Sequence, residues 1–347
     1  MVRERDQRLL AAGEDQNYSR RTKGREPKMT ITVVLCTYNR DQSLRRALTS
    51  VAASVLSGSV EWETLVVDNN SKDQTRKVVE EFCKRHPGRF RYLFEAQQGK
   101  SYALNAGIRE ARGHILAFMD DDVTVHPSWL QNLTAALQNE EWSGAGGRVV
   151  PEWNCSPPRW LSVESRHAFG PLVGFDPSPK PGQLKEAPIG ANMAFRRQMF
   201  EKYGGFRTDL GPRAAKYGTN EDSEFGDRLL SAGERLRYEP SALVYHPVPA
   251  SRIEKQYFLR WWFHKGQGSI RQYGVRPGTK YYVGGIPLFL FRNLGVWTFK
   301  WMVGIHPARR FASKLNVWTK VGEIVECYRR SREVRKGAQN RSVPEQV

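Results

Sequence analysis

The chain has 347 residues, 39% of them hydrophobic and 26% charged, which is long enough to bury a substantial core. Four widely spaced cysteines without a CxxC pair argue against a disulfide framework or a zinc cluster and favour a reducing compartment. The formal net charge of +18 is concentrated in residues 251–347, which hold 19 Lys/Arg and 5 Asp/Glu. This distribution predicts a nearly neutral globular domain at 30–250, followed by a distinct basic region.

The first 29 residues are polar, with eight Lys/Arg and five Asp/Glu, and their composition predicts a disordered basic arm. No apolar signal segment opens the chain, so a cytoplasmic location is expected.

Strands and helices are expected to alternate in the domain that follows. Runs of apolar, often β-branched residues predict strands at 31–36, 63–67, 90–94 and 115–119. Apolar residues at helical spacing predict helices at 43–56, 75–83 and 99–111. This alternation predicts an α/β fold with a mostly parallel sheet and βαβ crossovers. A Walker A motif and a GxGxxG motif are both absent, so neither a P-loop nor a typical dinucleotide fold is indicated.

Three of the predicted strands end in polar clusters, at Thr37–Asn39, Asp68–Ser71 and Asp120–Asp122. Ligands of open α/β sheets bind just past the carboxyl ends of the strands. The third cluster ends the apolar run ILAFM with three adjacent carboxylates, which repel one another unless a cation offsets their charge. Mg²⁺ or Mn²⁺ would be a natural partner. The alternative is a solvated turn before a helix, where acidic residues are favoured in any case.

Four segments of the domain resemble family-2 glycosyltransferases with the GT-A fold. They are VVLCTYNR, LVVDNNSKDQT, GKSYALNAGIREARGHILAFMDDDV and TNEDSEFGDRLL, in the order found in the family, between about Thr30 and His246. The resemblance implies a nucleotide-diphospho-sugar transferase fold, with a nucleotide-binding half at 30–125 and an acceptor half at 126–250. It also implies an inverting, metal-dependent transfer from a nucleotide-sugar donor to an acceptor hydroxyl. UDP is the expected nucleotide, with GDP and dTDP left open.

The resemblance assigns donor-binding roles to residues that follow the first strands. Thr37, Tyr38 and Asn39 are expected to touch the nucleotide. Asp68 is expected to accept a hydrogen bond from the base, and the alternative role for it is a helix N-cap. Lys100 is expected to meet a phosphate or the base, unless it is an ordinary solvated lysine.

Two asparagines complete the expected donor site. Asn105 lies in the most specific of the four segments, although it could equally satisfy backbone groups of its own helix. Asn192 lies in GANMAFRR, Gly190–Arg197, which resembles the family segment between the donor and acceptor sites, and it is expected near the sugar.

The acidic triplet corresponds to the DxD signature of the family. By that analogy Asp120 contacts the ribose or the metal, Asp122 ligates the metal that bridges the diphosphate, and Asp121 faces the sugar. His246 ends another predicted strand, SALVYHPV, and the resemblance places it in the metal shell. Neutral imidazole is an acceptable Mn²⁺ ligand, although a lone histidine is more often structural.

The candidate general base lies in TNEDSEFGDRLL. Asp222 is expected to take the proton of the acceptor hydroxyl as that oxygen attacks the anomeric carbon. Glu221 is the competing choice, or it orients acceptor hydroxyls. The apolar spacing that follows is helical, so capping of a helix N-terminus would also account for these acids.

The basic region 251–347 is expected to form amphipathic helices, with aromatic and basic residues interleaved from Ile253 to Lys265. Its apolar stretch 281–291 is too short to span a bilayer. Helices of this composition predict peripheral contact with an anionic membrane, on the inner face of the cytoplasmic membrane, where a lipid-linked acceptor or another glycan acceptor would be met. The alternative is that the helices pack on the catalytic domain and dimerise. No motif supports nucleic-acid binding.

Two other functions remain compatible with the sequence. A sugar nucleotidyltransferase also uses acidic metal sites, but it usually has a Gly-rich basic loop where this chain has CTYNRD. A non-catalytic membrane scaffold with a transferase-like domain is the second alternative. The complete set of Asp120–Asp122, Asp222 and His246 argues against it.

Overall fold

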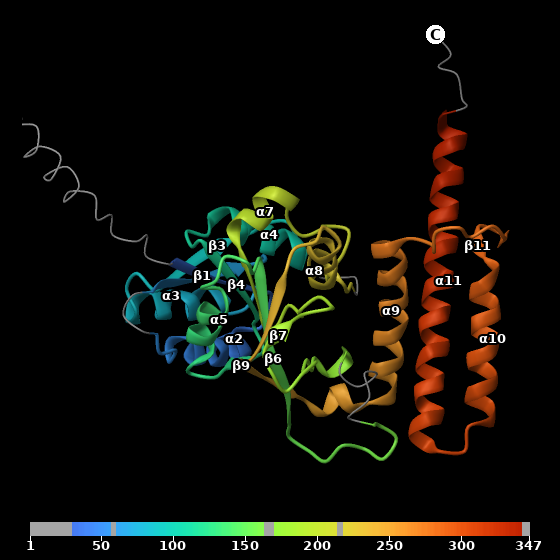
Figure 1. Ribbon diagram of the computed structural model, residues 1–347, viewed down its shortest axis with the longest axis horizontal. Helices are drawn as coiled ribbons and strands as arrows, with labels where there is room; N and C mark the ends of the chain where they lie inside the picture. The colour runs from blue at the N-terminus through green and yellow to red at the C-terminus, as the bar shows by residue number, and fades with distance from the viewer. Residues whose placement is uncertain (1–29, 57–59, 163–169, 214–217, 342–347) are drawn as a thin grey trace, which may run out of the picture.

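The computed structural model of the protein describes residues 30–56, 60–162, 170–213 and 218–341, with the backbone alone from 336 onward. The predicted arm at 1–29 lies outside the described residues. A sheet with its flanking helices fills most of the first 250 residues, and three helices stand as a separate layer beside it (Figure 1).

The sheet domain alternates strands and helices along most of its length. In the half that begins the chain the elements are β1 (Thr30–Thr37), α2 (Asp41–Ala52), β2 (Glu61–Asp68), α3 (Thr75–Arg85), β3 (Phe90–Phe94), α4 (Lys100–Glu110), β4 (Ile115–Asp120) and β5 (Thr124–Val125). In the other half they are α5 (Trp129–Ala136), β6 (Gly144–Trp153), β7 (Gly182–Gln183), β8 (Met193–Arg196), α7 (Arg197–Tyr203), α8 (Glu221–Ser231) and β9 (Leu236–Val248).

The described part of the main sheet has nine strands in the order β3-β2-β1-β4-β8-β6-β9-β5, with β7 paired to β9. Strands β3, β2, β1 and β4 are parallel to one another. Strand β8 runs antiparallel to both β4 and β6. The register pairs Thr37 with Asp68 and Cys36 with Asp120, so the polar clusters predicted at three strand ends lie at one edge of the sheet. The predicted α/β fold is confirmed.

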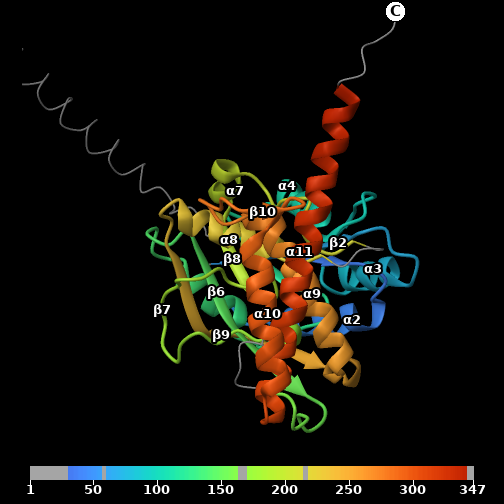
Figure 2. The same ribbon diagram turned by 90° about the vertical axis from the view of Figure 1, so that its right-hand side faces the viewer.

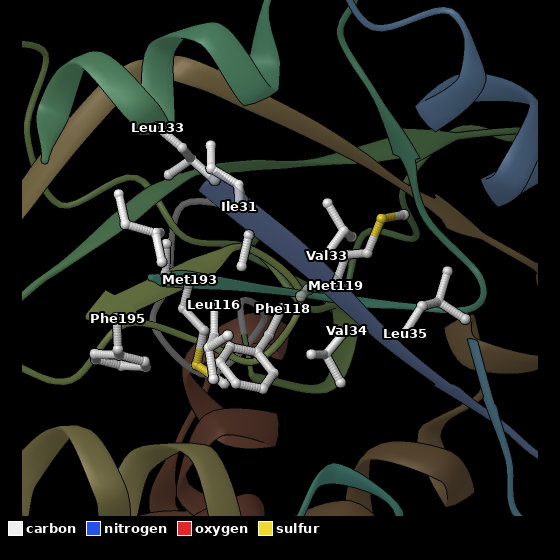
Figure 3. Close-up of a cluster of buried hydrophobic side chains, with 14 of the residues drawn as sticks. Ile31, Val33, Val34, Leu35, Leu116, Phe118, Met119, Leu133, Met193 and Phe195 are labelled. Atoms are coloured by element: carbon white, nitrogen blue, oxygen red, sulfur yellow. The ribbon is translucent and has the colours of Figure 1, made fainter. Parts of the chain in front are cut away.

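The centre of the sheet is buried on both faces. Ile31, Val33, Val34 and Leu35 of β1 are each at most 2% exposed, as expected for a parallel strand covered by helices on both sides. Figure 3 shows these residues beside Leu116, Phe118 and Met119 of β4 and Met193 and Phe195 of β8. Each such side chain stabilises the fold by about 1.5–3 kcal/mol when it is fully buried. This buried core fixes the positions of the strand ends that carry the polar clusters.

The helices predicted at 43–56, 75–83 and 99–111 are all present in the structure as α2, α3 and α4, and their ends differ by a few residues. The largest difference is α2, which ends at Ala52 and not at Leu56. The chain then turns away, and the backbone N–H of Val55 donates to the carbonyl of Pro127. Helical periodicity alone does not reveal such a contact, because its partner lies more than 70 residues away in the sequence.

After β9 the chain forms a short 3-10 turn and three long helices. These elements are η1 (Ala250–Ile253), α9 (Lys255–Tyr273), β10 (Tyr282–Val283), β11 (Ile286–Pro287), α10 (Leu288–Val303) and α11 (Pro307–Arg341). Figures 1 and 2 show α9 nearest the sheet domain and α10 on the outer side of the layer. No helix in the described ranges combines the length and the apolar character needed to cross a bilayer.

Helix α9 joins this layer to the sheet domain through an aromatic cluster. Phe258 is fully buried and packs edge-on against Trp160, which in turn packs against Phe311 of α11. Helices α9 and α11 cross at two glycines: a Cβ atom on Gly266 would overlap the carbonyl of Thr319, and one on Gly322 would overlap a carbonyl of α9. The absence of side chains there allows backbone-to-backbone packing.

Candidate active site

A cavity of about 360 Å³ opens at the sheet edge where β1, β2 and β4 end. This volume lies within the usual range for small-molecule sites. The cavity is lined by seven of the residues that the sequence predicts for the site, namely Thr37, Tyr38, Lys100, Asp120, Asp121, Asp122 and His246. The structure therefore brings together the first polar cluster, the acidic triplet and the end of β9.

Asp121 is the most deeply buried member of the triplet, at 5% exposure. Its carboxylate accepts hydrogen bonds from the Thr37 hydroxyl at 2.7 Å and from the Arg40 guanidinium at 3.0 Å. Burial raises the pKa of Asp121 to about 6, although Arg40 acts to lower it. Because Asp121 faces β1 and Arg40, it holds the first strand end against the triplet.

Asp122 is held by two arginines and a histidine. One of its oxygens accepts from Arg40 and from Arg252, each at 3.0 Å, and the other lies 3.5 Å from Nε2 of His246. Burial acts to raise the pKa of Asp122, but His246, Arg252 and Arg40 outweigh it and hold the pKa well below its usual range. Asp122 is therefore ionised and electrostatically satisfied.

Asp120 turns to the other side, toward Lys100. The Lys100 ammonium lies 2.7 Å from an Asp120 oxygen and 3.2 Å from a Glu221 oxygen, so it bridges the triplet and the acidic helix α8. Burial acts against the charge on Lys100, but Asp120, Glu221 and Asp222 hold its pKa well above the usual value. Lys100 is a fixed positive charge between the two acidic groups, and not a solvated surface lysine.

The predicted set of three metal ligands is only partly assembled. Among the residues that the structure describes, no three or more His, Cys, Asp or Glu side chains converge on one point. Asp122 and His246 lie together and offer the oxygen and imidazole nitrogen that suit Mn²⁺ or Mg²⁺. Asp120 does not join them, because Lys100 holds its carboxylate. Two protein ligands fit a metal whose remaining ligands are phosphate oxygens and water, which is the usual arrangement for Mg²⁺.

The two candidate bases differ in their surroundings. Glu221 is 4% exposed and faces Lys100, and burial raises its pKa. Asp222 is partly exposed, and its carboxylate accepts from the backbone N–H of Gly190 at 2.6 Å and of Ser223 at 2.7 Å. Both acids border a narrow gap, with no room for a water molecule, that shares Lys100 and Asp120 with the lining of the main cavity. Asp222 is accordingly the more accessible of the two and is held in one orientation by backbone donors.

Two of the predicted donor residues hold loops at the rim of the cavity. Asn39 has a left-handed backbone (φ 51°), accepts from the Lys72 N–H and donates its own N–H to Ser71, which ties the loop after β1 to the loop after β2. Asp68 is buried and accepts from the Ser71 N–H and the Tyr92 hydroxyl. Asp68 is not a helix N-cap, because α3 begins at Thr75.

The two predicted asparagines serve other segments of the fold. Asn105 forms a pair of hydrogen bonds with the backbone of Phe206, one in each direction, and so holds a neighbouring loop and not its own helix. Asn192 is fully buried beneath β6 and β9. It accepts from the Trp129 indole and donates to the carbonyls of Arg148 and Ala242. Its expected place near the sugar is corrected, because every polar atom of its amide has a partner in the scaffold.

Helix α9 reaches the start of the acidic helix α8. Lys265 donates to the side-chain oxygen of Asn220 at 2.7 Å, and the amide of Asn220 donates to Gln272 at 2.6 Å. Asn220 has φ 77°, a left-handed conformation that few residues other than glycine adopt readily. Two side chains of the C-terminal layer thus hold the residue immediately before Glu221 and Asp222.

The side chains that line the cavity and that the sequence analysis does not assign to the site include three arginines and an asparagine, namely Arg40, Arg213, Arg252 and Asn69. Asn69 is buried and donates to the carbonyls of Glu95 and Gln97, so it shapes the floor. Asn69 lies within the predicted cluster Asp68–Ser71 and Arg40 directly follows the cluster Thr37–Asn39, which could have indicated them. Nothing in the sequence distinguishes Arg213 or Arg252 from the many other arginines of the chain.

Known proteins resemble this chain in sequence and in fold. Residues 32–204 match the family model described as Glycosyl transferase family 2. Glucosyl-dolichyl phosphate glucuronosyltransferase of Haloferax volcanii is 27% identical over 231 residues, or 65% of this chain and 72% of that protein. Succinoglycan biosynthesis protein ExoM of Rhizobium meliloti is 26% identical over 238 residues, or 68% of this chain and 73% of that protein.

A solved structure shows a similar fold. It is the mannosyltransferase PcManGT of Pyrobaculum calidifontis in complex with GDP-Man and Mn²⁺, with a TM-score of 0.51 at 17% identity, covering 91% of this chain and 81% of that one. The likeness confirms the predicted GT-A arrangement of the sheet. The family match runs from β1 through the acidic triplet to the end of α7, whereas Asp222 and His246 lie beyond it. Through the domain at residues 32–204, this chain belongs to glycosyl transferase family 2 and is a glycosyltransferase.

Proposed function

We propose that the protein transfers a sugar from a nucleoside-diphosphate donor, a UDP-sugar, to an acceptor hydroxyl with inversion of the anomeric carbon. The observation that carries this proposal is the position of the Asp222 carboxylate beside this cavity. The cavity combines the acidic triplet with four cationic side chains, Arg40, Lys100, Arg213 and Arg252. The carboxylate of Asp222, which is partly exposed, lies next to Lys100 and Asp120 of that lining.

The cavity suits an anionic diphosphate that leaves during the reaction. Thr37 and Tyr38 line its β1 side, where the nucleoside would lie. Lys100 and the arginines place positive charge around the diphosphate, and guanidinium forks match phosphate geometry well. A divalent metal held by Asp122 and His246 would neutralise the charge that develops on the leaving diphosphate. Asp120 keeps Lys100 in position between the donor and the acidic helix.

Asp222 is the proposed general base. Its two backbone hydrogen bonds fix the carboxylate, and the missing side chain at Gly190 leaves room beside it, because a Cβ there would lie 3.2 Å from an Asp222 oxygen. A carboxylate so placed accepts the proton of the acceptor hydroxyl as that oxygen attacks the anomeric carbon. Glu221 is less suited to this role, because it is buried and paired with Lys100.

The proposed acceptor is a lipid-linked sugar met at an anionic membrane. Between Lys255 and Gly322 the chain has 12 Lys/Arg and no Asp or Glu. Helix α10, on the outer side of the layer (Figure 2), exposes apolar side chains along its length. Those most exposed are Leu288, Val296, Phe299, Met302 and Val303, followed by Ile305 just after the helix. Arg292 and Lys300 of the same helix are exposed as well, and exposed apolar and basic residues on one helix suit the interface of a bilayer that carries anionic lipid.

A relative supports this acceptor class, because the Haloferax volcanii protein is described as acting on glucosyl-dolichyl phosphate. The experiment that tests the proposed function is a donor screen in which UDP-, GDP- and dTDP-sugars are offered with Mn²⁺ and a panel of acceptors. Release of a nucleoside diphosphate that requires an acceptor is the expected result. Release of pyrophosphate from a sugar phosphate and a nucleoside triphosphate would instead identify a nucleotidyltransferase. Binding of nucleotide and metal without any turnover would favour a scaffold.

A further inference from the structure

The side chain of Arg252 fills the space between the two residues that would hold a metal. Its Nη2 atom lies 3.0 Å from an Asp122 oxygen, and its Nη1 atom lies 3.0 Å from Nε2 of His246. The other ring nitrogen, Nδ1, lies 3.1 Å from the carbonyl of Pro247, which can only accept. The ring nitrogen Nε2 thus lies against both Arg252 and Asp122.

Every carboxylate of the acidic triplet has a cationic side chain as its partner in the protein without ligands. Asp120 is paired with Lys100, Asp121 with Arg40, and Asp122 with both Arg40 and Arg252. A divalent cation that approached Asp122 and His246 alone would compete with the Arg252 guanidinium for Nε2 of His246 and would meet its positive charge beside the same carboxylate. It would bind more tightly if Arg252 moved away.

The backbone at Arg252 allows such a movement. Arg252 lies in η1, the four-residue turn between β9 and α9, and its neighbours Ala250 and Ser251 are exposed. The guanidinium reaches the cavity through a flexible side chain and can change direction without moving β9. The other anionic group expected in the cavity is the donor diphosphate, which offers a guanidinium more acceptor oxygens than Asp122 does.

We infer that Arg252 is an exchangeable cation of the donor site: it neutralises Asp122 in the free enzyme and passes to the diphosphate when metal and nucleotide bind together. This inference rests on the proposed function. It implies that the free enzyme binds metal weakly and that nucleotide strengthens metal binding, because the nucleotide takes over Arg252. By linkage, metal strengthens nucleotide binding by the same factor.

The test measures binding of Mn²⁺ and UDP to the full-length protein, with free Mn²⁺ followed by electron paramagnetic resonance and UDP by calorimetry. Arg252→Ala should tighten binding of Mn²⁺ alone, on the order of tenfold, about the strength of one charge-assisted hydrogen bond. The same variant should weaken binding of UDP in saturating Mn²⁺ by a similar factor. The factor by which UDP strengthens Mn²⁺ binding should fall. Arg252→Lys keeps the positive charge but loses the forked guanidinium. Its affinities for Mn²⁺ and for UDP should therefore lie between those of the wild-type protein and those of Arg252→Ala.

The matched control is Arg213→Ala, which removes a positive charge from the same cavity. Arg213 lies against the Tyr102 ring and the carbonyl of Thr208, so its loss should not release Asp122. It should therefore leave binding of Mn²⁺ alone close to the wild-type value. A circular dichroism melt on each variant checks folding.

The inference is overturned if Arg252→Ala weakens binding of Mn²⁺ alone, leaves it unchanged, or fails to weaken binding of UDP. A purely structural role for Arg252 predicts that both affinities fall. Failure of the proposed function would look different: the wild-type protein would release no nucleoside diphosphate in the donor screen, whatever the effect of Arg252→Ala on the binding of Mn²⁺ and UDP.

Discussion

Asn220 and Gln272 are 52 residues apart in the sequence and share a hydrogen bond of 2.6 Å. This bond ties the residue before both candidate catalytic acids to the first helix of the C-terminal layer. Lys265 of the same helix donates to the other end of the Asn220 side chain. The basic C-terminal region is therefore part of the scaffold that positions α8, whatever else it contacts. Removing it at Ala250 would disturb the site as well as any membrane contact, so point variants of the full chain are the appropriate tests.

The first prediction concerns Asp122. Asp122→Ala should reduce turnover at least about 10²-fold, because the variant loses the carboxylate that would hold the metal, and metal-borne charge stabilisation amounts to several kcal/mol. Binding of UDP in Mn²⁺ should weaken as well, which calorimetry can measure. Asp209→Ala is a suitable control, because Asp209 pairs with Arg207 on the surface. Normal activity of Asp122→Ala without added metal would contradict the assignment.

The second prediction separates the two acids of α8. Asp222→Asn should lower kcat by roughly 10²–10⁴, the usual contribution of a general base, while binding of UDP and Mn²⁺ persists. Glu221→Gln should lower kcat less, because Glu221 is buried and paired with Lys100 and is therefore poorly placed to take a proton from an acceptor. Steady-state kinetics on both variants measures kcat, and calorimetry measures the binding of UDP and Mn²⁺. The roles are exchanged if Glu221→Gln is the inactive variant and Asp222→Asn the active one.

The third prediction is a pH dependence of stability that originates at Asp121. Its pKa is about 6 in the folded protein, against an ordinary value of 3.8 for an aspartate, so the folded chain binds its proton more tightly than the unfolded chain does. The free energy of unfolding should therefore decrease as the pH rises from about 4 to about 6, by about 1.4 kcal/mol for each unit of pKa shift. Asp121→Asn should remove this part of the dependence. Denaturant melts across this pH range, with a chelator present, would show identical slopes for the two proteins if Asp121 titrated normally.

The fourth prediction concerns the outer face of α10. The protein should float with liposomes that contain anionic lipid at low salt, and less so at high salt, because exposed Lys/Arg near such a surface contribute about 1 kcal/mol each. The double variant Phe299→Glu, Met302→Glu should lose this binding while it keeps its fold, since both side chains are more than 60% exposed. Val334→Glu on α11 is the matched control, because Val334 is 73% exposed but lies outside that face. A wild-type protein that stays in the soluble fraction would rule out the membrane contact.

The fifth prediction tests the corrected role of Asn192. Asn192→Ala should destabilise the fold by several kcal/mol, because the indole of Trp129 and two backbone carbonyls would lose their partner in a buried site, at about 1–3 kcal/mol each. The KM for the donor should change little in the fraction that remains folded. Thermal melts and kinetics at low temperature can separate the two effects. A large change in KM with unchanged stability would return Asn192 to the sugar site.

The sequence predicts the sheet domain well because local patterns determine it. β-branched runs and helical spacing recur in regular alternation, and the acidic triplet follows directly on a buried strand. The carboxyl ends of parallel strands meet at one edge, so the meeting of Thr37 with the triplet follows from the topology. Asp222 and His246 could be placed near that edge by the resemblance alone.

The parts that the sequence does not predict are long-range side-chain contacts. Asn105 bonds to a loop 101 residues away, and Arg252 meets Asp122 across 130 residues. No local pattern marks which arginine of a basic region points inward. For the same reason the sequence predicts a distinct basic region and leaves its packing on the catalytic domain open, whereas the structure joins α9 to the residue before the acidic helix through Lys265 and Gln272.

The crossing of α9 and α11 at Gly266 and Gly322 makes the site sensitive to a distant position. Gly322 lies on α11, a helix that does not line the cavity. A methyl group on Gly322 would overlap the backbone of α9, which cannot rotate away as a side chain can, so the two helices would have to move apart. Lys265 immediately precedes Gly266 on α9. The same displacement would move the Lys265 ammonium away from Asn220, and the residue before Glu221 and Asp222 would lose that hydrogen bond. The spacing of two helices at their crossing thus affects the position of Asp222, the proposed general base.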